Sequence, residues 1–230
     1  MRTAAVLPVK SFGAAKQRLG SLLGSGSRHA LAQAMFQDVV SSLRKVPGIE
    51  QVVIVAAEPT VEFSAEEQVV LLQDELEDGQ SAATLIGIRW AIDAGFERVL
   101  LVPGDTPLLA VDEVDAMLAG AAADGTSVVI VPDRHDTGTN ALLLAPPDVI
   151  EPSFGPDSLA RHVATAQAAA VSHRVERVPS LIFDVDTSED LAVVAAAIEA
   201  GRMVAPRTRG ALRQLDRAGA RLHVSAGAQS

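Results

Sequence analysis

The feature that most constrains the fold of this chain is a regular alternation between short apolar runs and longer helical stretches. The apolar runs are Ala4–Leu7, Gln51–Val55, Val69–Leu72, Val99–Val102 and Ser127–Val131. The stretches with helical spacing are Arg28–Val46, Ser81–Ala94, Val111–Ala123, Ser158–Ala170 and Ser188–Ala200. Strand followed by helix, repeated, builds a mostly parallel sheet covered by helices on both faces. The sequence therefore predicts an α/β fold.

Two later apolar segments and the tail complete the expected organisation. Ala141–Leu144 and Leu181–Phe183 are interpreted as further strands, the first of them antiparallel after a short loop. At 230 residues the chain is long enough for one substantial core, and we expect a single domain over residues 1–202. Residues 203–230 carry arginines among small residues and are interpreted as an extension. A surface helix and a partly disordered tail are both open, and the solvated tail is favoured.

Charge and composition exclude several classes of protein. A formal net charge of -10 argues against a general nucleic-acid binder, because phosphate neutralisation needs a surplus of Lys and Arg. The chain has no cysteine, which excludes disulfides and thiolate chemistry and fits a reducing compartment. The apolar part of MRTAAVLPVK is too short for a signal peptide or a membrane span. We therefore expect a cytoplasmic protein that binds neither membranes nor nucleic acid.

A single acid follows the apolar run that ends at Val102. In LLVPGDTPLL, Pro103 and Gly104 close the run and Asp105 comes next. Ligands of open α/β sheets lie in the crevice outside the carboxyl ends of the strands, so Asp105 is a candidate metal or substrate ligand. The alternative is a helix cap or turn former.

A second acidic strand end lies in LIFDVDTSEDL. Its period of two places Asp184 and Asp186 on the same side of an extended segment, where the two carboxylates repel each other unless a cation lies between them. With Asp105 as a third oxygen donor, the set suits Mg²⁺, which prefers hard oxygen ligands. The residues from Thr187 to Asp190 have the pattern of a helix cap with an acidic first turn.

The loop after the first predicted strand is rich in cations. VLPVKSFGAAKQRL contains Lys10, Gly13, Lys16 and Arg18, and it lacks the GKS or GKT ending of a Walker A loop. A flexible glycine with three cations can wrap a triphosphate, while a basic surface loop is the alternative.

A helix start offers a second place for an anion. FGPDSLARH ends a loop and begins a helix, so we expect backbone N–H groups near Ser158 to point outward and receive a carboxylate or phosphate. Gly155 permits a close approach. Arg161 and His162 lie on the helical face of Ser158 and extend this site, with a surface or capping role as the alternative for His162.

A nearby segment, TGTN, adds a hydroxyl and a backbone donor at Thr139. Arg134 and His135 lie close to it in the sequence, and no role beyond proximity is assigned to them.

Five segments together resemble a known family. PVKSFGAAKQRL, GDTP, DTGTN, FGPDS and FDVDT occur in this order between Met1 and about Ala200. Their combination is similar to the guanylyltransferases of deazaflavin coenzyme (coenzyme F-420) biosynthesis, which activate phosphoenolpyruvate or 2-phospho-L-lactate with GTP. The resemblance implies a Rossmann-related sheet of the nucleotide-diphospho-sugar transferase, or glycosyltransferase-A-like, type.

The resemblance also implies roles for particular residues. It implies Mg²⁺ bound by Asp105, Asp184 and Asp186, with the acceptor on three other positions, Thr139, Gly155 and Ser158. Nucleotide contacts are expected from Lys10, Gly13, Lys16, Arg18, Gly79 and Ser81. In EDGQSAAT, Gly79 matches the Gly-Leu-Asn-like turn of the family, while Gln80 and Ser81 depart from it, so guanine preference is less firmly implied than nucleotidyl transfer.

The reaction we expect is in-line attack by an acceptor phosphate oxygen on the α-phosphorus of GTP, aligned and neutralised by the metal, Lys10, Lys16 and Arg18. The Ala-, Arg- and Gly-rich composition indicates a bacterial high-GC coding sequence, which favours phosphoenolpyruvate as the acceptor, since bacterial members of the resembled family are associated with it. Three alternatives stay open: 2-phospho-L-lactate guanylyltransferase, a sugar-phosphate nucleotidyltransferase and a non-catalytic nucleotide-binding protein. A homodimer is also open, and the absence of a G-x-S-x-G segment disfavours a serine hydrolase.

Overall fold

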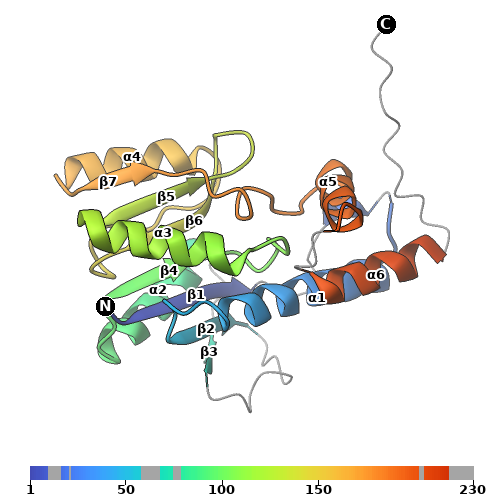
Figure 1. The fold of residues 1–230 in the computed structure, drawn as a ribbon, viewed down its shortest axis with the longest axis horizontal. Coiled ribbons are helices and arrows are strands. Elements are labelled where there is room, and N and C mark those ends of the chain that lie inside the picture. The colour runs from blue at the N-terminus through green and yellow to red at the C-terminus, as the bar shows by residue number, and fades with distance from the viewer. Residues whose placement is uncertain (10–16, 21, 58–67, 75–78, 202–204, 218–230) are drawn as a thin grey trace, which may run out of the picture.

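One twisted sheet organises the computed structural model, which describes residues 1–9, 17–20, 22–57, 68–74, 79–201 and 205–217 (Figure 1). Within these residues the sheet has seven strands in the order β3-β2-β1-β4-β6-β5-β7. The strands are β1 (Thr3–Val9), β2 (Gln51–Ala56), β3 (Val69–Gln73), β4 (Arg98–Leu101), β5 (Val128–Pro132), β6 (Thr139–Leu144) and β7 (His173–Val175).

The direction of β6 differs from that of the other described strands. It runs antiparallel to both of its neighbours, with Leu142 opposite Leu101 of β4 and Ile130 of β5, while the remaining strand pairs are parallel. The amino end of β6 therefore lies where β4 and β5 have their carboxyl ends. Because ligands bind at the carboxyl edge of such sheets, the first residues of β6 are delivered to that edge.

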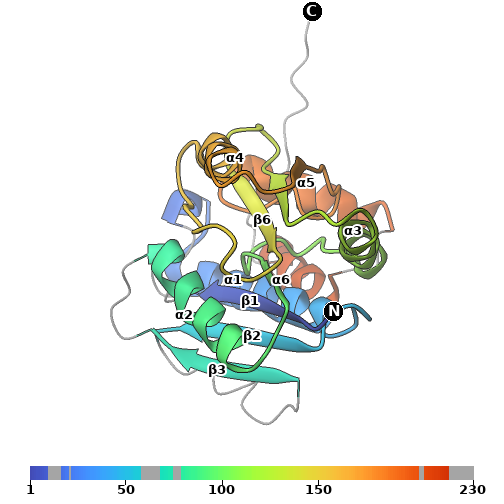
Figure 2. The ribbon, with the colours of Figure 1, turned by 90° about the vertical axis from the view of Figure 1, so that its left-hand side faces the viewer.

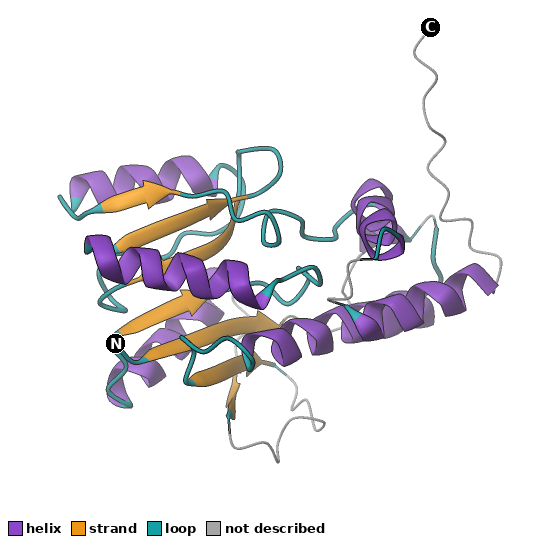
Figure 3. Ribbon diagram, in the orientation of Figure 1, coloured by secondary structure: helices purple, strands orange, loops and turns teal. Residues whose placement is uncertain are grey.

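Helices cover both faces of the sheet, as Figure 2 shows. The described helices, purple in Figure 3, are α1 (Ser25–Leu43), α2 (Gly79–Asp93), α3 (Val111–Asp124), α4 (Ser158–Ala168), α5 (Ser188–Glu199) and α6 (Pro206–Arg217), with a short 3-10 helix η2 (Gln17–Leu19). Alternate residues of β1 face opposite layers: Leu7 packs with α1 and α3, and Val6 packs with α2 and α4. Strands buried on both faces explain why the apolar runs contain no alternating polar residue.

A third apolar cluster lies beyond the carboxyl edge of the sheet. It joins the first half of α1 to α5 and α6, which Figure 1 shows beyond the strand ends. Leu19 of η2, Leu108 from the loop after β4 and Val185 from the loop before α5 are fully or almost fully buried in it. This cluster therefore anchors the loops that follow the strands.

The structure confirms the predicted α/β fold, including the antiparallel strand at Ala141–Leu144. The strand expected at Leu181–Phe183 is wrong. Leu181 is buried, but its N–H donates to Val178 O within a turn, and the place beside β5 belongs to β7. The sequence HRV of β7 is short and polar, with Val175 exposed at the sheet edge, so hydrophobic patterning did not reveal it.

The tail contains a helix that packs on α1. Leu212 and Leu215 of α6 are buried, and the carboxylate of Asp38 in α1 accepts hydrogen bonds from the N–H of Arg207 (3.2 Å) and the N–H of Thr208 (2.7 Å). The Thr208 hydroxyl donates to the same carboxylate at 2.8 Å. Of the two interpretations of the tail, the helix therefore holds for residues 206–217, and residues 218–230 lie outside the described part. None of the described helices is long and apolar enough to cross a membrane.

Replacing Asp38 tests this packing. Asp38→Ala leaves the buried Thr208 N–H without its acceptor, which lowers the free energy of unfolding by about 2 kcal/mol. The control, Asp93→Ala, removes an exposed acid of α2 and changes it by less than about 0.5 kcal/mol. Urea unfolding measures both. A gain in stability in Asp38→Ala contradicts the packing, since a carboxylate buried without α6 would only destabilise the fold.

Candidate active site

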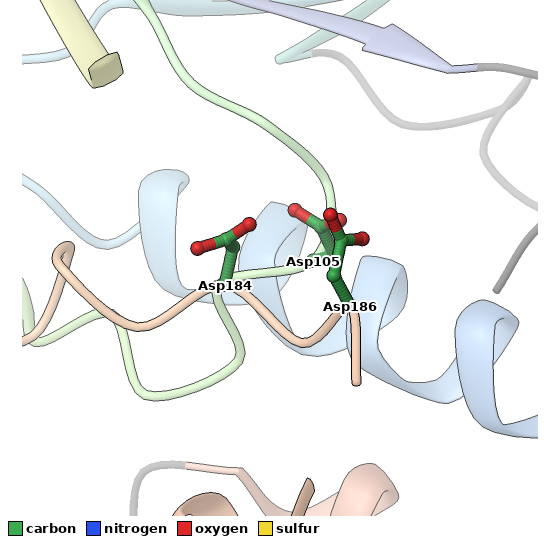
Figure 4. Close-up of side chains that lie close together, drawn as sticks. All are labelled: Asp105, Asp184 and Asp186. Carbon is green, nitrogen blue, oxygen red and sulfur yellow. The ribbon is translucent and has the colours of Figure 1, made fainter. Parts of the chain in front are cut away.

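Three aspartates predicted as metal ligands converge at the carboxyl edge of the sheet (Figure 4). One carboxylate oxygen from each of Asp105, Asp184 and Asp186 lies within 4.8 Å of the other two. Asp105 and Asp184 are half-buried, and Asp186 is exposed. The structure thus brings together side chains that are about 80 residues apart in the sequence.

A buried residue between the two later acids holds the cluster together. The N–H of Val185 donates to the carbonyl oxygen of Asp105 at 3.1 Å, which ties the loop before α5 to the loop after β4. The side chain of Val185 is fully buried in the third apolar cluster. Because Asp184 and Asp186 flank this anchor, their carboxylates lie next to that of Asp105 (Figure 4).

The start of α5 fixes the backbone of the last of these acids. The Asp190 carboxylate accepts hydrogen bonds from the N–H groups of Asp186 (3.1 Å) and Thr187 (2.7 Å), and Thr187 forms a capping box with Asp190. Arg134 binds the other oxygen of Asp190 at 2.9 Å. The predicted helix cap is confirmed, and Arg134 gains a role that its sequence position did not reveal.

Gly104 has a steric role in the loop that presents Asp105. A Cβ atom at this position would lie 2.8 Å from Cδ2 of Phe36 in α1, closer than such atoms approach each other. The turn also contains the buried Thr106, whose hydroxyl donates to Pro103 O at 3.3 Å. The GDTP segment is therefore shaped by packing against α1 as well as by its acid.

The surroundings of Asp184 disfavour its charged form. Burial, followed by the charges of Asp105 and Asp186, raises the pKa of Asp184 to about 6, although a hydrogen bond from Asn140 acts in the opposite direction. That bond runs from Asn140 Nδ2 to Asp184 Oδ1 at 3.2 Å. Three crowded, anionic oxygen donors are the environment that a hard divalent cation relieves, so the donor set fits Mg²⁺.

Asn140 is a site residue that sequence reasoning missed. Val131 of β5 pairs with Ala141 and Pro132 pairs with Thr139, so Asn140 is the extra residue of a β-bulge. Its amide also donates to Leu181 O at 3.0 Å, on the side of the sheet covered by α1 and α3. The sequence signals were its place at the end of the DTGTN segment and directly before the apolar run Ala141–Leu144.

On the other side of this bulge lie two residues predicted to bind the acceptor. Thr139 and Ser158 are buried, and the Thr139 N–H donates to Ser158 Oγ at 2.9 Å. Gly155 has φ +109°, a conformation that favours glycine. The N–H groups of Ser158 and Leu159 do not point outward as predicted: they donate to Gly155 O and Thr137 O, both at 3.2 Å. The expected donors at this helix start are used within the protein.

His162 is fully buried under this region, so the surface role considered for it is wrong. Its Nδ1 lies 2.9 Å from Thr139 Oγ1, and its Nε2 accepts the N–H of Ser153 at 2.9 Å. Burial and then the charge of Arg161 lower its pKa to about 4. Its neighbour Arg161 donates to Ser153 O (3.0 Å), Phe154 O (3.1 Å) and Pro156 O, so its guanidinium holds the 153–156 loop.

The predicted nucleotide-binding residues are described only in part. Lys10, Gly13 and Lys16 lie outside the described residues, and Arg18 is exposed in η2, beside the buried Leu19.

The other two nucleotide candidates lie at the start of α2. Gly79 has φ +90°, and the hydroxyl of Ser81 accepts the N–H of Phe154 at 3.0 Å. The predicted nucleotide end of α2 therefore touches the predicted acceptor loop.

The raised pKa of Asp184 predicts how stability depends on pH without metal. The folded state holds the Asp184 proton up to about pH 6, whereas the unfolded chain releases it near 3.8, so stability falls as pH rises through this window. Asp184→Asn removes the penalty and stabilises the metal-free protein at pH 8 by up to about 3 kcal/mol. At pH 4 the difference vanishes.

Thermal unfolding in EDTA and in MgCl₂ measures this effect. Mg²⁺ is expected to raise the Tm of the unmodified protein at pH 8 and to leave that of Asp184→Asn unchanged. The control is Asp148→Asn, an exposed acid outside the cluster, which should behave like the unmodified protein. A destabilised Asp184→Asn in EDTA at pH 8 contradicts the electrostatic crowding.

Solved structures with a similar fold support the predicted fold type. A protein from Desulfovibrio desulfuricans G20, described as a nucleotide-diphospho-sugar transferase, superposes with a TM-score of 0.75 at 21% identity, covering 94% of this chain and 96% of that one. A cytidylyltransferase from Leptospira borgpetersenii superposes with a TM-score of 0.56 at 13% identity, covering 95% of each chain. The predicted nucleotide-diphospho-sugar transferase type of fold is confirmed.

Proteins found by sequence comparison have higher sequence identity to this chain than these solved structures do. A phosphoenolpyruvate guanylyltransferase of Conexibacter woesei is 44% identical over 216 residues, which cover 94% of this chain and 97% of that protein. A 3-phospho-D-glycerate guanylyltransferase of Colwellia psychrerythraea is 34% identical over 197 residues, with coverage of 85% and 92%. The family described as "Guanylyl transferase CofC like" matches residues 3–200. Because this match spans almost the whole α/β domain and the relatives are 34–44% identical over most of their length, this chain belongs to the CofC-like guanylyl transferase family.

Proposed function

We propose that this protein is a phosphoenolpyruvate guanylyltransferase that joins GTP to phosphoenolpyruvate and releases pyrophosphate. The observation that carries the proposal is the cluster of Asp105, Asp184 and Asp186 at the carboxyl edge of the sheet, which is joined to β6 by the hydrogen bond from Asn140, the residue after Thr139, to Asp184. The relative from Conexibacter woesei, whose name states this activity, aligns over 94% of the chain. The reaction belongs to the biosynthesis of a deazaflavin coenzyme, coenzyme F-420, in the cytoplasm.

The chemistry needs alignment and charge neutralisation more than it needs a base. A phosphate oxygen of the acceptor attacks the α-phosphorus of GTP, a new P–O bond forms, and the bond from that phosphorus to the bridging oxygen of pyrophosphate breaks. The attacking oxygen is already anionic near neutral pH, so no proton has to be removed. The product is enolpyruvyl-diphospho-guanosine.

The acids and the cationic loop have complementary tasks. Asp105, Asp184 and Asp186 would hold Mg²⁺, and the ion would supply neutralisation of phosphate charge. Lys10, Lys16 and Arg18, which flank Gly13 in the sequence, would offset the charge that remains on the triphosphate. Gly79 and Ser81 place the start of α2 against the nucleotide.

The acceptor side suits a small anion. Thr139, Gly155 and Ser158 lie on segments that internal hydrogen bonds hold in place, and the guanidinium of Arg161 adds a positive charge to the 153–156 loop. Hydroxyl groups and a guanidinium would bind an anionic group of the acceptor, and they would not distinguish acceptors that differ elsewhere. The preference for phosphoenolpyruvate over 2-phospho-L-lactate rests instead on the names of the relatives and on the amino-acid composition.

Two substitutions test the metal-binding role in catalysis. Asp184→Asn and Asp186→Asn exchange an anionic oxygen for an amide of the same shape, so pyrophosphate release at saturating GTP and Mg²⁺ should fall by at least about a hundredfold. Asp148→Asn is the matched control and keeps full activity. Near-normal turnover in both variants, with circular dichroism unchanged, would sink the metal assignment.

A panel of acceptors tests the substrate. With GTP and Mg²⁺, kcat/KM for phosphoenolpyruvate should exceed that for 2-phospho-L-lactate and 3-phospho-D-glycerate by about tenfold, because a small difference in pocket shape is worth about 1–3 kcal/mol. Pyrophosphate release measures all three reactions. A preference for either other acid replaces the acceptor, whereas activity with sugar phosphates alone replaces the reaction by sugar-phosphate nucleotidyl transfer. Binding of GTP without turnover on any acceptor favours a non-catalytic protein.

A further inference from the structure

We propose that His162 is a positioning residue for the acceptor: its ring fixes the Thr139 hydroxyl as a hydrogen-bond donor that faces the acceptor's anionic group. His162 is fully buried and does not itself touch the substrate. The identity of the acceptor rests on the proposed function, whereas the direction of the hydrogen bonds rests on the geometry alone.

The first step is the tautomer of the imidazole. A backbone N–H can only donate, so the bond of 2.9 Å from Ser153 N requires a lone pair on His162 Nε2. In a neutral ring the proton must then be on Nδ1. Burial and the nearby guanidinium of Arg161 keep the ring neutral, as its lowered pKa indicates.

The second step is the direction of the next bond. His162 Nδ1 lies 2.9 Å from Thr139 Oγ1, and because Nδ1 carries the proton, the hydroxyl oxygen is the acceptor. Within the described residues this is the one hydrogen bond of the Thr139 hydroxyl. Its own proton is therefore left for an oxygen that none of the described residues supplies.

The third step is that the neighbouring hydroxyl has the same polarity. Ser158 Oγ accepts the N–H of Thr139 at 2.9 Å, which leaves its own proton to be donated. Two adjacent hydroxyls each receive a protein N–H, and each keeps one proton. Donors oriented before a ligand arrives need no reorganisation when they bind an anion. A neutral or anionic group that can only accept, such as a phosphate or carboxylate oxygen, fits this arrangement.

The position of the ring is also well defined. Phe154 packs edge-on against it, with centroids 5.3 Å apart, and Arg161 holds Ser153 and Phe154 through their carbonyl oxygens. The Ser153 N–H is thereby kept on Nε2. The tautomer is thus set by the backbone of the 153–156 loop and transmitted to Thr139.

Two substitutions separate the two ring nitrogens. The amide nitrogen of Asn reproduces a donor near Nδ1, and the amide oxygen of Gln reproduces an acceptor near Nε2. We expect His162→Gln to raise the KM for phosphoenolpyruvate about tenfold, the loss of about one hydrogen bond, with the KM for GTP unchanged. His162→Asn should stay within about threefold of the unmodified protein. The control, His173→Asn, alters a ring at the start of β7, which lies at the amino end of β5 and away from the carboxyl edge where the site lies.

A double-mutant cycle shows whether His162 acts through Thr139. Thr139→Val removes the hydroxyl at nearly constant volume, so adding His162→Gln to it should raise the acceptor KM no further. Independent, multiplying effects overturn the proposal and leave His162 a purely structural residue. An equal rise in the KM for GTP also overturns it.

The tautomer itself is read without any turnover. In ¹⁵N NMR spectra of the protein labelled in its histidines, and with His162→Gln to assign the signal, His162 should show a protonated Nδ1 and an unprotonated Nε2 at pH 7. A protonated Nε2 overturns the proposal. Absence of turnover with every acceptor overturns the proposed function alone. The positioning role is still decided by the tautomer and by calorimetry, in which His162→Gln should weaken the binding of phosphoenolpyruvate.

Discussion

The site depends on the reversal of one central strand and on the bulge at its start. Because β6 runs against β4 and β5, its amino end meets their carboxyl ends, and residues before an apolar strand reach the functional edge. The bulge at Asn140 then shifts the alternation of side chains. Asn140 reaches Asp184 on one side of the sheet, while Thr139 reaches His162 on the other. A single irregular residue thus connects the acidic cluster, where we propose a metal, with the proposed acceptor side.

The acidic cluster is an electrostatic cost that the fold has to support. Three carboxylates within 4.8 Å of one another repel, and burial, followed by the charges of Asp105 and Asp186, raises the pKa of Asp184. The buried Val185 and its hydrogen bond to Asp105 O hold the acids together despite it. The Asp190 capping box, itself paired with Arg134, fixes the next turn. Apolar burial and backbone hydrogen bonds therefore hold the three acids close together despite their repulsion.

The acceptor side is built on a different principle, since its polar groups are buried and bonded to one another. Ser158, Thr139 and His162 form a chain that ends at the backbone of Ser153, and Phe154 extends it to Ser81 at the start of α2. A network of this kind is rigid, because every broken bond leaves a buried polar group unsatisfied. This network links the start of α2, where we predict nucleotide binding, to the predicted acceptor loop through hydrogen bonds of neutral groups.

The sequence by itself determined the α/β alternation, the capping of α5 and the acid that follows β4, because periodicity, caps and strand ends are local. Tertiary structure alone decided that Leu181–Phe183 is not a strand, that α6 packs on Asp38, and that the N–H groups at Ser158 turn inward. It also decided the roles of Asn140 and His162. The hydrogen-bond partners of Asn140, His162 and Thr208 lie between 9 and 170 residues away, and a sequence pattern carries no signal for the direction of such a hydrogen bond.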